Sequence, residues 1–231
     1  MRQTLTVMAV CVIVTAMGPG SAMTAPKPST IPVAWEIEFD SLAPRAIMVQ
    51  PEGESHPRLF WYVKYTVTNH YRDKKGQPQD LIYTPSFTLY TDTGEVVKAN
   101  MALPEAVYRQ IVKIENDPLM ISPAGMVGKD IKLLHGDDNA KTSVAIWPDF
   151  DPKAGKFDIF VGGLSGENRT VVLQEPVTET RKDTITGEAT TVTVDKIVLV
   201  KTLQLTYSIP GEASARRQTP PTLVEKKWVM R

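Results

Sequence analysis

Few residues of this 231-residue chain are of types that could carry out nucleophilic chemistry. The single cysteine, Cys11, lies in an apolar run near the N-terminus, and the most suggestive serine is Ser165 in Gly162-Gly-Leu-Ser-Gly166. A nucleophile elbow requires Gly-x-Ser-x-Gly, whereas here a glycine directly follows the serine. We therefore interpret this stretch as a turn that ends a strand. The sequence predicts no catalytic residue and a non-enzymatic protein.

The residues that could bind a metal ion are scattered. The three histidines lie far apart along the chain: His56, His70 and His135. No pair of them has the spacing of a zinc site. Asp149, Asp151 and Asp158 surround a proline and a glycine, but they do not follow the spacing of an EF-hand calcium loop. We interpret these acids as polar turns and expect no metal and no cofactor.

Aromatic side chains give the best indication of a binding surface. Phe60, Tyr62, Tyr90 and Phe160 occupy strand positions opposite the face that we expect to be buried. If they meet solvent, they could form a platform for a sugar or a protein partner. We favour the alternative that a helix and the C-terminal tail cover them, because those segments carry apolar residues that must pack somewhere.

The first 25 residues have the order of a secretory signal peptide. Arg2 supplies the positive charge, 5–17 is apolar, and small residues follow a glycine-proline break. We expect cleavage after Ala22 or, as a second choice, after Ala25. An uncleaved anchor would need roughly 20 apolar residues, more than this run contains. The sequence thus predicts an extracytoplasmic protein, in the periplasm, at the cell surface or secreted, with no transmembrane segment after cleavage.

Composition and charge indicate which class of partner the protein could bind. Lys and Arg number 26 and Asp and Glu number 26, so the basic excess of a nucleic-acid-binding protein is missing. Removal of 1–25 removes the only cysteine, so the mature chain must be stable without disulfides. We expect the partner to be another envelope protein or a polysaccharide, and not a nucleic acid.

Alternating apolar residues predict a mainly β protein. The clearest case is 59–67, where Trp61, Val63 and Tyr65 share one face. Further strands are expected at 33–39, 87–91, 95–98, 143–147, 156–161, 170–173, 177–182, 190–194 and 196–209. A hairpin turn around 186–187 would join the strands 177–182 and 190–194. Many short strands of this kind favour an antiparallel β-sandwich over a parallel α/β sheet.

The strand 196–209 contains one irregularity. Ile197, Leu199 and Leu203 alternate on the inward face, but Lys201 interrupts that face, so we expect the strand to be only half-covered there. Val198 and Val200 on the other face predict that the first half of the strand is buried on both sides.

One helix interrupts the strands. Pro104 suits the first helical position, and Val107, Ile111 and Ile114 recur at helical spacing before a stop at 116–118. The segment 119–136 fits either a short helix or an edge strand.

The domain organisation follows from these elements. After a Pro-rich tether at 26–32, we expect one domain over 33–210, with a helical insertion near 104–136. Two domains remain the alternative. In the C-terminal tail, 211–231, we expect the apolar end around Trp228 to dock on the core.

Several runs resemble a known pattern. The run 59–69 is similar to a strand that ends in an asparagine turn, 87–94 to the next strand and its turn, and 134–137 with 144–148 to a loop and strand before a final hairpin. Together, over about 58–162, they resemble exported bacterial immunoglobulin-like domain proteins of the planctomycete-type secreted class, although His135 stands where a proline usually precedes the glycine. The resemblance implies an immunoglobulin-like sandwich and export, and it assigns no catalytic residue.

These observations lead to three hypotheses. We expect an exported non-enzymatic interaction or structural module of the cell envelope. The alternative is a carbohydrate-binding accessory protein that uses its outward-facing aromatics. A hydrolase with a carboxylate pair such as Asp149 and Asp151 also remains open, because the sequence does not show which acids converge in space.

Overall fold

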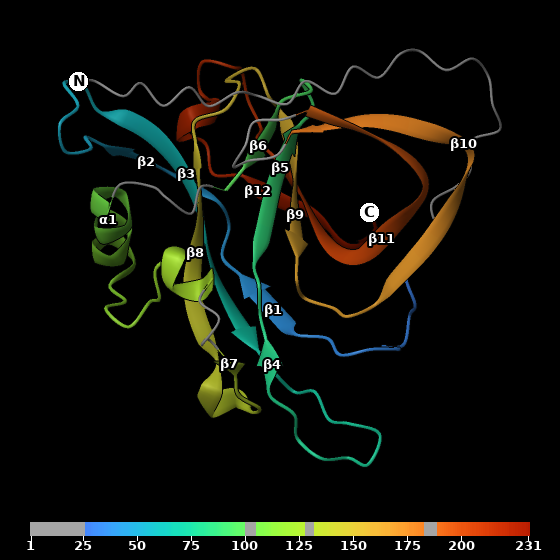
Figure 1. The fold of residues 1–231 in the computed structure, drawn as a ribbon. Coiled ribbons are helices and arrows are strands. Elements are labelled where there is room, and N and C mark those ends of the chain that lie inside the picture. Colours follow the sequence, from blue (N-terminus) through green and yellow to red (C-terminus); the bar gives the residue numbers. More distant parts are fainter. Residues whose placement is uncertain (1–25, 100–104, 128–131, 183–188) are drawn as a thin grey trace.

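A computed structural model describes residues 26–99, 105–127, 132–182 and 189–231 (Figure 1). The protein is mainly β, with 51% of its residues in strands and 11% in helices, and its sheets are antiparallel. This confirms the predicted antiparallel, mainly β fold. The expected signal peptide at 1–25 and the expected turn at 186–187 lie outside the described residues.

The first sheet has β3 at its centre. Its strands are β1 (Glu38–Ser41), β2 (Arg45–Val49), β3 (Arg58–Thr68) and β8 (Lys141–Pro148). β8 pairs along most of one edge of β3, while β1 and β2 pair one after the other along its opposite edge. The sequence pattern missed β2, and β1 begins later than the expected strand 33–39, whose Val33 is exposed.

The second sheet is built on β9 and β11. Its strands are β5 (Ser86–Thr91), β6 (Val96–Lys98), β9 (Lys156–Gly162), β10 (Asn168–Lys182), β11 (Ala189–Ser208) and β12 (Thr222–Met230). The C-terminal part of β11 lies between β9 and β12, whereas its N-terminal part pairs with β10 alone. We call this two-stranded extension, 168–182 and 189–200, the arm. In Figure 1 the arm curves away from the sheets on the right.

Side chains from both sheets fill one core, which holds the sheets face to face. β3 contributes Trp61, Val63 and Tyr65 to this core, and β11 contributes Leu203, Leu205 and Tyr207. Both sets alternate along their strands, as expected when every second side chain points to the same face. Aromatic stacking adds to the packing, with ring centroids 5.4 Å apart for Phe157 and Tyr207. We call the two sheets without the arm, together with this core, the body.

The opposite face of β3 is covered by the helix α1 (Glu105–Glu115). Val107 and Ile111 of the helix pack with Phe60 and Tyr62 of β3, and all four are buried. The helix ends as predicted, at Asn116, which adopts a left-handed φ of 48° that asparagine tolerates. Phe60 and Tyr62 therefore do not face solvent, and the expectation that the helix covers them is confirmed.

Polar contacts fasten the C-terminal end of α1 to the sheet. The Tyr62 hydroxyl donates a hydrogen bond of 2.7 Å to Glu115, which Arg45 also pairs with at 2.9 Å. Lys64 of β3 pairs with Asp117 at 2.9 Å. Burial raises the pKa of the Tyr62 hydroxyl to about 12, so it remains a donor to Glu115 at neutral pH.

The remaining segments are short. The ambiguous region 119–136 contains a 3₁₀ turn, Ala124–Val127, and the strand β7 (Lys132–Leu133), which pairs with β4 (Leu81–Ile82). Two further 3₁₀ turns are Asp137–Asn139 and Arg216–Gln218. Within the described ranges, no helix has the length and apolar character of a membrane-spanning segment.

The C-terminal tail is more regular than the sequence indicated. Thr222–Met230 forms β12 along the edge of β11, with Met230 buried and Trp228 packed against the core. Lys226 reaches across to the first sheet and donates a hydrogen bond of 3.0 Å to the backbone oxygen of Phe39.

Ile111→Ala should destabilise the protein by about 3 kcal/mol, because it leaves a cavity between α1 and β3. Ile114→Ala, three residues along the same helix but exposed, should change stability by less than about 0.5 kcal/mol. Urea unfolding followed by circular dichroism measures both. Equal effects of the two substitutions would show that α1 is not packed through Ile111.

Candidate functional site

A buried lysine lies where the arm joins the body. Lys201 is on the inward face of β11, and its side chain is 2% exposed. The expectation that β11 is only half-covered at this position is therefore wrong. Its ammonium group contacts the carboxylate of Glu36 and lies 3.5 Å from an oxygen of Glu167. It also donates to the backbone oxygen of Ser29 at 3.2 Å, and its Nζ lies 4.9 Å from the centroid of the Trp228 ring.

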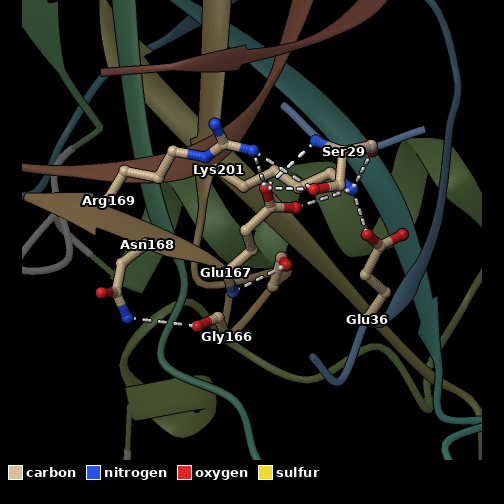
Figure 2. Close-up of polar contacts among 8 residues, drawn as sticks. Ser29, Glu36, Gly166, Glu167, Asn168, Arg169 and Lys201 are labelled. Carbon is tan, nitrogen blue, oxygen red and sulfur yellow. Dashed lines mark hydrogen bonds and ion pairs between the residues drawn. The ribbon is translucent and has the colours of Figure 1, made fainter. Parts of the chain in front are cut away.

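The second carboxylate of this cluster is held by the N-terminal segment. Figure 2 shows Glu167 Oε1 directed at Ser29, whose backbone N–H and hydroxyl donate to it at 3.0 Å and 2.8 Å. Arg169, at the start of the arm, lies 3.7 Å from the same oxygen. We call Ser29, Glu36, Glu167, Arg169 and Lys201 the lysine cluster. The region expected to be a free tether, 26–32, thus makes specific contacts with the body through Ser29.

The glycine-rich turn after β9 positions Glu167. Gly163 has a φ of 81°, and a Cβ at Gly166 would lie 2.4 Å from the Trp35 ring, so both positions favour glycine. The backbone N–H of Gly166 donates to the backbone oxygen of Trp35, and the backbone N–H of Lys201 donates to the backbone oxygen of Glu167 at 2.9 Å. The Ser165 hydroxyl accepts a hydrogen bond from the backbone of Glu167. Ser165 is thus buried in a turn, as the sequence indicated.

The cluster keeps its charges paired. Burial alone would raise the pKa of the Glu167 carboxyl, but the hydrogen bonds from Ser29 and the charge of Lys201 outweigh it and lower the pKa below its ordinary value. Glu167 is therefore ionised at neutral pH although it is buried. Its second oxygen, Oε2, accepts no hydrogen bond from the part of the chain that the structure describes.

The structure does not bring the four predicted aromatic residues together. Phe60 and Tyr62 lie under α1, whereas Tyr90 and Phe160 lie on the outer face of the second sheet. Tyr90 and Phe160 meet edge to face, with ring centroids 5.3 Å apart. The guanidinium of Arg231 lies over both rings, 4.9 Å and 4.1 Å from their centroids. Arg231 of the C-terminal tail therefore shields part of both rings, which are partly buried.

The candidate carboxylate pair has other partners. Asp149 accepts a hydrogen bond from the Trp61 indole at 3.2 Å and pairs with Arg217. Asp151 accepts from the backbone of Lys153, and this hydrogen bond, the largest of several causes, lowers the pKa of the Asp151 carboxyl. Asp149 and Asp151 therefore each bind groups of the neighbouring loops, and they do not face each other as an acid pair through a shared hydrogen bond.

The described histidines and acids are not gathered as metal ligands. His70 pairs with Glu38 at 2.9 Å, and its ring centroid lies 6.4 Å from that of His135. Across the described ranges, no three side chains of His, Cys, Asp or Glu are grouped as metal ligands.

The structure also contains a groove that the sequence did not predict. It has a volume of about 860 Å³ and lies between β2 and 217–221. Its apolar lining includes Met48, Leu59 and Trp61, with Asp149 and Arg217 at one wall. Such a groove could accept an apolar chain, but its residues come from segments far apart in the sequence.

Comparison of the chain with protein-family models, with curated proteins and with solved structures finds no match. A functional interpretation therefore depends on the geometry of the molecule itself. Sequence reasoning noticed Lys201 as an irregularity but missed the cluster around it, since Glu36 is 165 residues away along the chain.

Acid should weaken the fold through Glu167. Because its folded pKa lies below its ordinary value of 4.5, the unfolded chain binds the proton more readily. Glu167 therefore contributes stability that is complete above about pH 4.5 and is lost as the pH falls through the lower folded value. Chemical unfolding between pH 7 and pH 3 should show a shallower decline for Glu167→Gln than for the wild type.

The exposed pair of Glu225 and Lys227 supplies the matched control. Glu225→Gln should reproduce the wild-type decline, because exposed ion pairs contribute little. A Glu167→Gln profile parallel to that of the wild type would contradict the role assigned to Glu167.

Proposed function

We propose that this protein is an exported, non-enzymatic interaction or structural module of the cell envelope. The observation that carries the proposal is the arm, a long two-stranded extension whose apolar face has no covering layer among the described residues. The expectation from the sequence that Val198 and Val200 are buried on this face is wrong, because both are exposed.

The uncovered face is rich in valine. Val198, at 61% exposure, shares it with Val200, because alternate residues of β11 point the same way. Val172 lies opposite Lys196 in the register of β10 and β11 and therefore also belongs to this face, at 60% exposure. Val177, opposite Val194, extends the face beyond an irregularity in β10. We call Val172, Val177, Val194, Val198 and Val200 the valine face.

An arm of this kind is typical of a protein that binds a partner. A two-stranded hairpin without a second layer is at best marginally stable in water. An exposed apolar patch on a folded protein commonly marks an interaction surface. The lysine cluster fixes the base of the arm to the body through Arg169, Glu167 and Lys201. The arm, held at its base by the lysine cluster, would then present the valine face to another envelope protein.

We further propose that the two sheets form an immunoglobulin-like sandwich and that 1–25 directs export and is removed. The shared core of two antiparallel sheets supports the first proposal, and the sequence pattern of 1–25 supports the second. The carbohydrate-binding alternative has less support, because Phe60 and Tyr62 are buried and the guanidinium of Arg231 already lies over the rings of Tyr90 and Phe160.

The double variant Val172→Thr/Val198→Thr keeps shape and β-propensity but makes the valine face more polar. Loss of about 2 kcal/mol of apolar burial should weaken attachment to a partner roughly thirtyfold. The measurement is the fraction of protein retained in the envelope of the native host after a salt wash. Val96→Thr, an exposed valine in β6 away from the arm, is the matched control and should behave as the wild type. Unchanged retention of the double variant would contradict the proposal.

The proposal that the protein is exported leads to a separate prediction about its N-terminus. The protein recovered outside the cytoplasm should begin at Met23 or at Pro26, the two N-termini left by cleavage after Ala22 or Ala25. N-terminal sequencing or mass spectrometry of the recovered chain checks this. Intact Met1–Arg231 found only in the cytosol would refute export.

A further inference from the structure

Lys201 and Glu36 are placed as an amine and a carboxyl that could react with each other. The Nζ of Lys201 contacts a carboxylate oxygen of Glu36, as Figure 2 shows. The lysine side chain is buried, whereas that of Glu36 is 21% exposed and therefore reaches solvent. Glu167 supplies a second carboxylate, and its Oε2 lies 3.5 Å from the same Nζ with no hydrogen-bond partner in the described chain.

We propose that Lys201 and Glu36 become joined by an isopeptide bond, with Glu167 as the proton relay. The Nζ–Cδ bond forms as Nζ attacks Cδ of Glu36, and one Cδ–O bond breaks. The ammonium group gives up two protons, which leave with that oxygen as one water molecule. The positive and negative charges cancel in a neutral amide, so no oxidant, reductant or other co-reactant is required.

The two carboxylates have different roles because their surroundings differ. Glu167 Oε1 accepts two hydrogen bonds from Ser29, which keep this group ionised. Oε2 lies 3.5 Å from the ammonium Nζ and has no hydrogen-bond partner in the described chain, so this is the oxygen placed to take a proton from the ammonium and pass it to the departing oxygen of Glu36. Glu36 receives no hydrogen bond from Ser29 and touches the amine directly, so its carbon is the one that Nζ attacks.

The surroundings favour the reaction in three ways. Holding two groups in contact replaces a slow bimolecular encounter by an intramolecular step. Amide formation removes two opposite charges from a desolvated position, where charges are costly. The partial exposure of Glu36 lets the released water leave.

The bond would join two distant parts of the chain. Glu36 precedes β1 at the edge of the first sheet, and Lys201 lies in β11 of the second, 165 residues later. Closing a loop of this length restricts the unfolded chain strongly. The described residues contain no cysteine, so this amide would provide the covalent cross-link that a disulfide provides elsewhere.

The test is the intact mass of the purified full chain compared with that of Lys201→Met, which lacks the amine. Both proteins carry the same N-terminus, so its contribution to the mass cancels when the two masses are compared. The wild type should be lighter than its sequence requires by one water molecule, and the variant should not. Proteolysis of the wild type should yield a branched peptide that joins the segments around Glu36 and Lys201. Loss of the bond should lower the Tm by on the order of 10 °C.

Two further measurements separate this bond from an ordinary ion pair. Glu167→Gln should keep its strands, as seen by circular dichroism, but retain the full sequence mass, because the relay is lost. Lys64 and Asp117 form the internal control, since this pair is also in contact but its lysine is 19% exposed, against 2% for Lys201, and they should yield no branched peptide. A wild-type protein of full sequence mass after incubation in the folded state overturns the proposal, and so does a water loss that maps to other residues. If Lys201→Met does not fold, the wild-type peptides alone decide the question.

Discussion

A single ammonium group held away from water constrains how this protein is assembled. Lys201 stands in β11 at a position that alternation assigns to the core, and an unpaired charge there would cost several kcal/mol. The countercharges come from Glu36, before β1, and from Glu167, in the turn after β9. The N-terminal segment, the turn and the base of the arm must therefore meet at this one point. The glycines of the turn allow this close approach, and the hydrogen bonds from Ser29 hold the Glu167 carboxylate in place.

The body and the arm differ in whether a second layer of structure covers the faces of their strands. β3 is covered on both faces, by the second sheet on one and by α1 on the other, so its aromatic residues are all buried. The arm has the same two-residue periodicity but no layer over its valine face among the described residues. The same pattern of side chains thus gives a core in one place and an exposed surface in the other, and the difference lies in what packs against it.

This difference explains what the sequence could and could not predict. Alternation located β3 and most of the second sheet, and Pro104 with the spacing of Val107 and Ile111 located α1. β2 was missed because Ala46–Val49 is an unbroken apolar run without alternation. Val198 and Val200 were expected to be buried because apolar type does not reveal whether a covering layer exists. Lys201 was noticed as an exception, but its partners come from distant segments, and no local pattern identifies them.

The continuity of β11 has a mechanical consequence. Its 20 residues run without interruption from the arm into the body, where the strand lies between β9 and β12. Tension applied to the arm is therefore transmitted along one backbone into two hydrogen-bond ladders that are loaded in parallel. Those ladders would have to shear together before β11 could slide, so the body resists tension applied along the arm.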